Sequence, residues 1–246
     1  MAEALHEPLE APAVKETVEE LYERVSARFP ERGLRGVCGD LITLVEEVRT
    51  ASQVGHRQIR MARTISRVLM GVVVGITLVA LVLAARDAIQ GKAVHDSVDV
   101  LGLAETTISD VVYAAVAVFF LWSFPDRMQR SRLLRMLHQL RSTAHVIDMH
   151  QLTKDPEQLR PSFRPTKASK PLGMTRNQVE RYLDYCSEML SLVGKAAALC
   201  AEMSQDAVIL DTVNSIEQLT VGLSRKIWQK ISNLPPHDPT LEEETE

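Results

Sequence analysis

The segment VLMGVVVGITLVALVLAA, residues 68–85, decides the fold of this chain. Its eighteen residues carry no charge and lie between Arg67 and Arg86. At 1.5 Å per residue, a helix of this length measures about 27 Å, close to the roughly 30 Å hydrocarbon core of a bilayer. A core helix of a soluble protein is the alternative, but such a helix normally carries a polar stripe. The segment therefore predicts a transmembrane helix.

A second uncharged segment, VVYAAVAVFFLWSF, covers residues 111–124 and is short for a span. Extending it back to give residues 106–124 makes nineteen residues and places Asp110 near one membrane face. Tyr113 and Trp122 lie toward its opposite ends, as aromatic residues do at membrane interfaces. We predict a second span over 106–124, with a re-entrant segment as the alternative.

The basic residues set the expected orientation. Four arginines and no acidic residue lie in residues 57–67, before the first span, and five arginines against one aspartate lie in residues 126–141, after the second. The intervening residues 86–110 hold five acidic residues against two basic ones. The positive-inside rule therefore predicts a multi-pass protein of the plasma (inner) membrane, with both termini in the cytoplasm and the acidic loop outside.

The composition excludes several classes of protein. Three cysteines in 246 residues cannot form a disulfide framework. The sequence has no phosphate-binding glycine loop, nucleophile elbow, paired-cysteine zinc pattern or dinucleotide fingerprint, so we expect no enzymatic activity and no cofactor. The arginine clusters flank the spans, which explains them without nucleic acid as a partner.

The pattern as a whole predicts an all-α integral membrane protein. Its core is a two-span transmembrane helical hairpin with long cytoplasmic helical extensions and an antiparallel coiled-coil hairpin. The expected segments are a disordered N-terminal segment (1–12), cytoplasmic helices leading into the first span (13–67), transmembrane helix 1 (68–85), an outer loop (86–105), transmembrane helix 2 (106–124), a cytoplasmic stalk helix (125–152), a Pro-rich basic linker (153–174), a helical hairpin (175–233) and a disordered acidic tail (234–246).

Apolar residues spaced three and four apart mark the helical faces that we expect to be buried. These faces are Val14, Val18, Leu21 and Val25; Leu41, Leu44, Val48 and Ala51; Leu133, Leu137, Leu140, Ala144 and Ile147; Val179, Leu183, Cys186, Leu190, Val193, Ala197 and Cys200; and Ile209, Val213, Ile216, Thr220, Leu223 and Ile227. Thr175 and Gln178 have the spacing of a capping box. We expect a turn over residues 29–40, a continuous helix from about 40 to 85, and a kink or restart at Pro125.

Gly71 and Gly75 form the pattern GVVVG inside the first span. Small residues four apart allow two membrane helices to approach closely, so this pair predicts helix–helix association and a homo-oligomer. Two alternatives remain: glycine is tolerated in membrane helices, or the pair packs against this chain's own second span.

Asp110 and Glu105 are candidates for a pore or vestibule. An acidic residue near the edge of the hydrocarbon core is costly unless it faces water or a partner. If several subunits surround an axis, Asp110 and Glu105, with Asp96 and Asp99, would attract cations. For Asp110 itself we favour a simpler interpretation, in which it caps a helix that begins at Val111.

His145, Asp148 and His150 form the one cluster that resembles a metal or acid–base site. His145 and Asp148 share a helix face, but His150 lies five residues from His145, about 140° around the helix. The metalloprotease pattern needs two histidines four apart with a glutamate between them. We therefore favour structural polar contacts and expect no metal, with a metal-dependent site at these residues as the alternative.

The segments HRQIRMARTISR (56–67) and RMQRSRLLRMLHQLRSTAHV (127–146) flank the two predicted spans. This layout resembles the two-transmembrane effector domains of the SLATT type, which are associated with bacterial nucleotide-sensing defence systems. The resemblance covers residues 50–150 in layout and composition, with no diagnostic motif. It implies a pore-forming effector held closed until triggered, and it carries over no catalytic or ligand residue.

These observations predict a non-enzymatic two-span protein of the lipid bilayer that oligomerises and acts as a cytoplasm-facing scaffold or regulatory interaction protein. The C-terminal helices are the expected surface for a cytoplasmic protein partner. The alternative is a subunit of an oligomeric pore or ion channel, including a defence-type effector.

Overall fold

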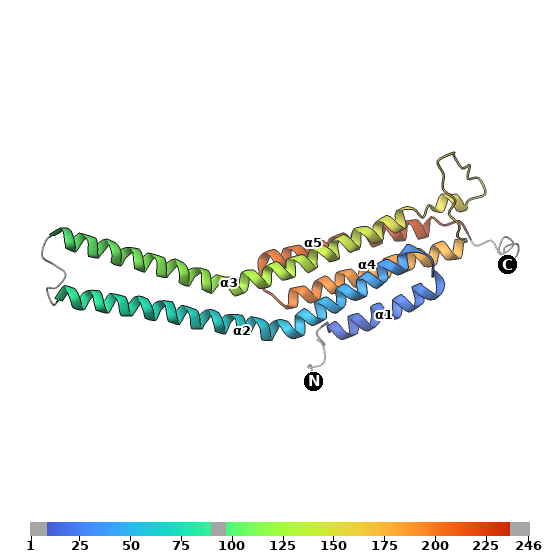
Figure 1. Cartoon of the computed structure of the whole chain (residues 1–246). Coiled ribbons are helices and arrows are strands. Elements are labelled where there is room, and N and C mark those ends of the chain that lie inside the picture. The colour runs from blue at the N-terminus through green and yellow to red at the C-terminus, as the bar shows by residue number, and fades with distance from the viewer. Residues whose placement is uncertain (1–8, 90–96, 237–246) are drawn as a thin grey trace, which may run out of the picture. The chain divides into compact units, whose positions relative to one another are not determined.

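The computed structural model describes residues 9–89 and 97–236, with the side chains of 52–59, 87–89, 97–101 and 103–104 left aside. In these ranges the chain is all-α, without a strand (Figure 1). The elements are α1 (Ala11–Arg28), α2 (Gly33–Ile89), α3 (Ser97–Leu152), the short 3-10 helix η1 (Pro156–Leu159), α4 (Arg176–Glu202) and α5 (Ala207–Ser232). The predicted all-α class is therefore confirmed.

The chain divides into two compact units. Unit 1 combines Met1–Ser52 with Leu133–Glu246, and unit 2 is Gln53–Arg132. Helices α2 and α3 each contribute to both units. Unit 1 therefore contains the start of α2, the end of α3 and the three shorter α-helices, whereas unit 2 contains the apolar parts of the two long helices.

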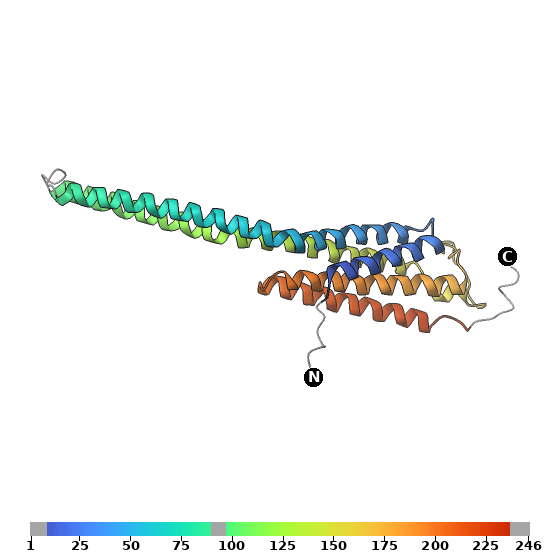
Figure 2. The same cartoon turned by 90° about the horizontal axis from the view of Figure 1, so that it is seen from below.

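Unit 1 is a helical bundle around one hydrophobic core. Its helices run side by side in both views of the ribbon (Figures 1 and 2). Every position of the predicted faces on α1, α3, α4 and α5 is buried, which confirms the spacing argument there. On α2, Leu41, Val48 and Ala51 are buried, but Leu44 is only partly buried and the neighbouring Val45 enters the core instead. Helix α4 packs against both α5 and α1. It is the central helix of the bundle, because Tyr182, Tyr185 and Met189 bury a second face beside the predicted one.

Side chains fix the beginnings of the two C-terminal helices. The hydroxyl of Thr175 accepts a hydrogen bond from the Gln178 N–H, and the Gln178 side-chain oxygen accepts one of 2.9 Å from the Thr175 N–H. This confirms the predicted capping box. At the start of α5, the Asp206 carboxylate accepts hydrogen bonds from the main-chain N–H groups of Val208 and Ile209. Both caps satisfy donors that lack partners inside a helix.

The described part of unit 1 is more extensively ordered than the sequence suggested. The expected turn at 29–40 is wrong from Gly33 onward, because α2 begins there and buries Leu34 and Cys38 in the core. At the N-terminus, α1 begins at Ala11, inside the segment 1–12 that we expected to be disordered. At the other end, Leu234 is buried. Apolar side chains that reach the core therefore order these ends, whereas residues 1–8 and 237–246 lie outside the described part.

The two long helices extend into the predicted outer loop. Helix α2 continues to Ile89 and α3 begins at Ser97, so at most 90–96, which lie outside the described residues, separate them. Pro125 lies inside α3, and the helix does not restart there. A proline removes one main-chain hydrogen bond but leaves the rest of the helix intact.

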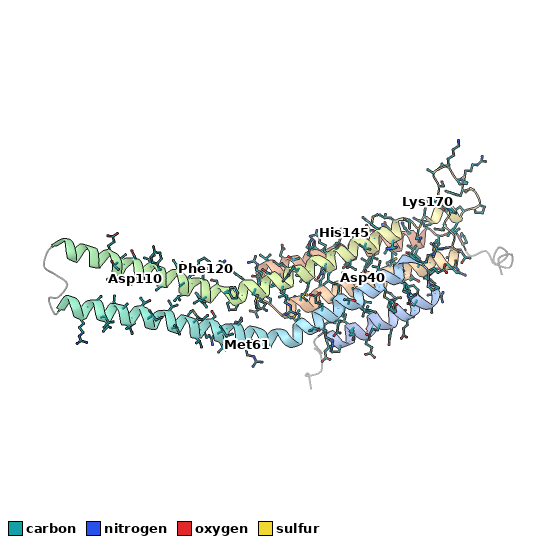
Figure 3. The ribbon with its side chains drawn as sticks, in the orientation of Figure 1. Asp40, Met61, Asp110, Phe120, His145 and Lys170 are labelled. Carbon is teal, nitrogen blue, oxygen red and sulfur yellow. The ribbon has the colours of Figure 1, made fainter. Side chains whose placement is uncertain are left out.

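In unit 2, α2 and α3 are both long and apolar enough to cross a membrane. The segment of α2 within Arg60–Arg86 reaches a mean hydropathy of 2.8, and that of α3 after Glu105 reaches 1.7. Neither apolar window is buried within the structure. Large apolar side chains of both helices are accordingly exposed. Ile76 of α2 is 66% exposed, and Phe120 of α3 is 58% exposed; Figure 3 labels Phe120.

Candidate functional site

The apolar parts of α2 and α3 face each other within unit 2. A shallow cavity of about 270 Å³ lies between them, lined from α2 by Val74, Thr77, Leu78 and Leu81 and from α3 by Val111, Ala114, Ala115 and Val118. Beyond one end of this cavity, the Ser66 hydroxyl donates a hydrogen bond to the main-chain oxygen of Leu121. Arg63 and Asp126 form an exposed ion pair of 3.2 Å nearby. The two helices therefore form a hairpin joined by both apolar and polar contacts.

Gly71 and Gly75 do not pack against the second helix of this hairpin. Both are exposed, and a Cβ atom built on either would meet nothing within 4 Å. At 100° per residue they lie about 140° and 180° around α2 from Ser66, which contacts α3. The alternative in which the glycine pair serves this chain's own hairpin therefore fails. Within the described structure nothing covers this face at the two glycines.

Asp110 is not a helix cap, since α3 begins at Ser97 and continues past Val111. The prediction that Asp110 caps a helix beginning at Val111 is therefore wrong. Asp110 is exposed on α3 (Figure 3). Glu105 is also exposed on this helix, five residues earlier and about 140° around it. Within one chain, Asp110 and Glu105 therefore lie on different faces of α3. Asp96 and the side chain of Asp99 lie outside the described part.

The structure gives Asp148 and His150 polar contacts with residues other than His145. His145 is exposed on α3 (Figure 3). Asp148 accepts a hydrogen bond of 2.7 Å from the Gln151 side chain, and Nδ1 of His150 lies 3.3 Å from the Tyr182 hydroxyl. Across the described ranges, no three histidine, cysteine, aspartate or glutamate side chains are grouped to hold a metal. Asp148 and His150 instead make the polar structural contacts that the sequence favoured.

The end of unit 1 around His150 contains a polar cluster that the sequence did not reveal. The Tyr182 ring packs edge-on against Phe29 and lies under the Lys154 ammonium, 4.9 Å from the ring centre. A Cβ atom on Gly33 would lie 2.6 Å from Cε1 of His150, so any larger residue at position 33 would require the imidazole ring to move. These contacts join α2, through Gly33, α3, through His150, and α4, through Tyr182, to Lys154 at the start of the linker.

Burial explains the acid–base properties of this cluster. It lowers the pKa of His150, with a smaller contribution from the nearby Lys154 charge. It also lowers the pKa of Lys154 and of Lys230, and raises the pKa of Tyr182 above its usual range. The neutral forms of His150 and Tyr182 are therefore favoured, which suits a structural joint. Lys230 reaches this end of the bundle from α5, where its ammonium group donates hydrogen bonds to the main-chain oxygens of Gln151 and Lys154. The sequence carries no signal for this contact, because the residues are more than seventy positions apart.

The three cysteines are free thiols buried in the core of unit 1. Burial raises the pKa of Cys38 to about 11, and of Cys186 and Cys200 to about 12. Thiols that stay protonated are poor nucleophiles and poor metal ligands. The cysteines therefore act as small apolar side chains of the bundle.

No family model matches this sequence, and no curated protein and no solved structure matches it. The fold and the exposed segments therefore define the class of protein: an all-α chain with two helices that are long and apolar enough to span a membrane.

Proposed function

We propose that this chain is a non-enzymatic, two-span membrane protein with both termini in the cytoplasm. In this proposal it self-associates and presents unit 1 as a scaffold or regulatory interaction domain. The observation that carries the proposal is the contrast between the units: unit 1 buries its apolar faces, whereas unit 2 leaves its most apolar segments exposed. Apolar surface costs about 25 cal/mol per Å² in water, and a bilayer removes that cost.

The charge pattern supports the orientation. Arg57, Arg60, Arg63 and Arg67 precede one apolar segment, and five arginines follow the other, while acidic residues predominate between the segments. Cytoplasmic flanks of membrane helices carry such an excess of basic residues. Unit 1 would therefore lie in the cytoplasm.

One face of α5 supports the scaffold role. Leu210, Val221 and Trp228 are exposed, at 43%, 59% and 58%, and lie within about 40° of one another around the helix. Exposed tryptophan with aliphatic neighbours is typical of residues that anchor a protein partner. We propose this face as the surface for a cytoplasmic partner.

Cysteine labelling tests the membrane topology. Gly102 and Ser142 are exposed, in the expected outer segment and in unit 1 respectively, and the three native thiols are buried. In spheroplasts of a bacterial expression host, a membrane-impermeant maleimide should label Gly102→Cys at once and Ser142→Cys only after lysis. Labelling of Ser142→Cys in intact spheroplasts, or recovery of the protein in an alkaline-washed soluble fraction, would contradict the proposal.

Crosslinking tests the scaffold role. A photo-crosslinker introduced at Ser232 should capture a cytoplasmic protein, and Val221→Ala with Trp228→Ala should abolish the product. Lys226 is exposed on another face of α5, so Lys226→Ala is the matched control and should leave the yield of the crosslinked product unchanged. A purified protein that is monomeric and captures nothing would exclude a scaffold.

A pore subunit is the second candidate, and the position of Asp110 inside α3 favours it. A carboxylate inside a continuous helix beside an apolar segment is costly unless it faces water or a partner. The SLATT-like layout of residues 50–150 supports the same candidate. Two spans cannot enclose a water path, so several subunits would be needed.

Flux measurements in liposomes test this candidate. Asp110→Asn should reduce cation flux, and Glu105→Gln should reduce it less. If the protein conducts and Asp110→Asn leaves the flux unchanged, Asp110 does not lie on the ion pathway.

A further inference from the structure

A groove of about 640 Å³ lies between the linker and the first turn of α4, and we call it the linker groove. Phe163, Leu172 and Met174 give it an apolar wall, and Lys170 lies at its edge. Thr175 and Gln178 of α4 close it on one side. Lys170 is exposed on the linker (Figure 3).

The segment that forms the linker groove is strongly basic. Residues 160–178 contain five basic residues and no acidic one. Arg160 and Arg176 at the two ends pair with Glu157 and Glu180. Between them, Arg164, Lys167 and Lys170 are exposed and make no ion pair with any residue that the structure describes. The groove therefore combines an apolar wall with the ammonium group of Lys170, and Arg164 and Lys167 are exposed on the same linker, within two positions of groove residues in the sequence.

The C-terminal segment of the same chain starts beside this groove. The Arg176 side chain donates a hydrogen bond of 2.9 Å to the main-chain oxygen of Pro235, and Arg176 lies between the groove residues Thr175 and Gln178 in sequence. Residues 237–246, HDPTLEEETE, follow directly and lie outside the described part. They contain five acidic residues, no lysine or arginine, and one leucine.

We propose that residues 237–246 dock in the linker groove of the same chain. Their carboxylates would face Arg164, Lys167 and Lys170, and Leu241 would lie on the apolar wall. Ten residues reach about 33 Å when extended, more than enough for a segment that leaves the fold beside the groove. A short tether holds such a segment at an effective concentration in the millimolar range, so the tail would exclude weaker acidic ligands from the groove.

Crosslinking of the full chain in nanodiscs tests the contact directly. A zero-length carbodiimide should join Lys167 or Lys170 to a carboxylate within residues 237–246, and peptide mass spectrometry identifies the bond. The yield should fall several-fold at 0.5 M salt, where the Debye length is only about 4 Å. Crosslinks from the tail spread evenly over exposed lysines such as Lys195 and Lys226 would overturn the proposal.

A competition experiment tests whether the tail occupies the groove. The probe is the fluorescent peptide HDPTLEEETE, measured by anisotropy against the full chain and against a variant that lacks residues 237–246. Because the variant keeps every described residue, its bundle should stay folded, which circular dichroism checks. The truncated chain should bind the peptide at least tenfold more tightly than the full chain. Equal binding, or no binding to either, would overturn the proposal.

Matched substitutions in the truncated chain locate the peptide. Lys167→Gln with Lys170→Gln should weaken binding at least fivefold, whereas Lys195→Gln with Lys226→Gln should leave it unchanged, although the charge removed is the same. A peptide with Leu241→Ser should also bind more weakly. An equal effect of the two lysine pairs would show general charge attraction and contradict docking in the groove.

Discussion

The ammonium nitrogen of Lys230, in the last turn of α5, donates a hydrogen bond of 2.8 Å to the main-chain oxygen of Gln151, in the last turn of α3. A second hydrogen bond, of 3.1 Å, reaches the main-chain oxygen of Lys154. Carbonyl groups at a helix C-terminus have no partner inside their helix and carry partial negative charge. Lys230 therefore caps α3 from another helix and holds the C-terminal hairpin against it.

Removal of this cap should destabilise unit 1. We expect Lys230→Gln to lower the free energy of unfolding by about 1–3 kcal/mol, because hydrogen bonds from a charged group to carbonyls are lost. Lys226→Gln, on an exposed face of the same helix, should change it by less than about 0.5 kcal/mol. Denaturant unfolding of the detergent-purified protein measures both. Equal values for the two variants would contradict the capping role.

Gly194 allows α4 and α5 to approach closely. A Cβ atom on Gly194 would lie 3.2 Å from Oγ1 of Thr220, so Gly194→Leu should cost about 1–3 kcal/mol through overpacking. A Cβ atom on Gly222 of α5 would meet nothing within 4 Å. Gly222→Leu should therefore leave stability unchanged or raise it by up to about 1 kcal/mol, because leucine favours the helix. Thermal unfolding distinguishes the two, and a stable Gly194→Leu variant would contradict the close packing.

The stability of unit 1 should fall in mild acid because of His150. Burial holds the pKa of His150 below its ordinary value of 6.5, so the unfolded chain takes up this proton more readily than the folded protein. The contribution of neutral His150 to the free energy of unfolding is fully present above pH 6.5. It is lost as the pH falls from 6.5 toward the lower pKa that His150 has in the folded protein. The unfolding temperature should therefore drop between pH 7.5 and about 5.5.

Two histidine variants on α3 test that assignment. His150→Gln should flatten the pH dependence, since the titrating group is gone. His145→Gln, at an exposed position five residues away, should leave the wild-type dependence in place. A His150→Gln protein with an unchanged pH profile would show that another group is responsible.

The native cysteines should be unreactive in the folded protein. Cys38, Cys186 and Cys200 are buried, and their raised pKa values keep them protonated at pH 8. We expect no reaction with a thiol reagent until the protein is denatured, and then three reactive groups. Reaction of one thiol in the native protein at the rate of a free cysteine would contradict its burial.

The sequence predicted most of the buried faces because each follows the helical repeat along one element. It could not predict the second buried face of α4, since Tyr182, Tyr185 and Met189 become interior only when α1 and the long helices pack around it. It also placed the start of α2 too late. We expected a turn over residues 29–40, but burial of Leu34 and Cys38 outweighs the cost of the glycines of this segment in a helix.

The candidate sites were less predictable, because their contacts join distant segments. The sequence singled out His150 as part of a histidine–aspartate cluster, yet its partner is Tyr182, thirty-two residues away on α4. Lys230 and Gly33 reach the same region from two other helices. In contrast, the sequence identified Gly71 and Gly75 from spacing alone, and the structure adds that they turn away from the chain's own second apolar helix.

Native mass spectrometry of the nanodisc-embedded protein tests the central claim most directly. The wild type is compared with two double variants. The first is Gly71→Leu with Gly75→Leu, and the second, the control, is Leu69→Ile with Ile76→Leu, at two exposed positions of the same helix. We predict that the wild type and the control are dimers or larger, and that the glycine variant shifts to smaller species because leucine keeps the helices apart. A wild-type protein that is monomeric in the bilayer would contradict self-association.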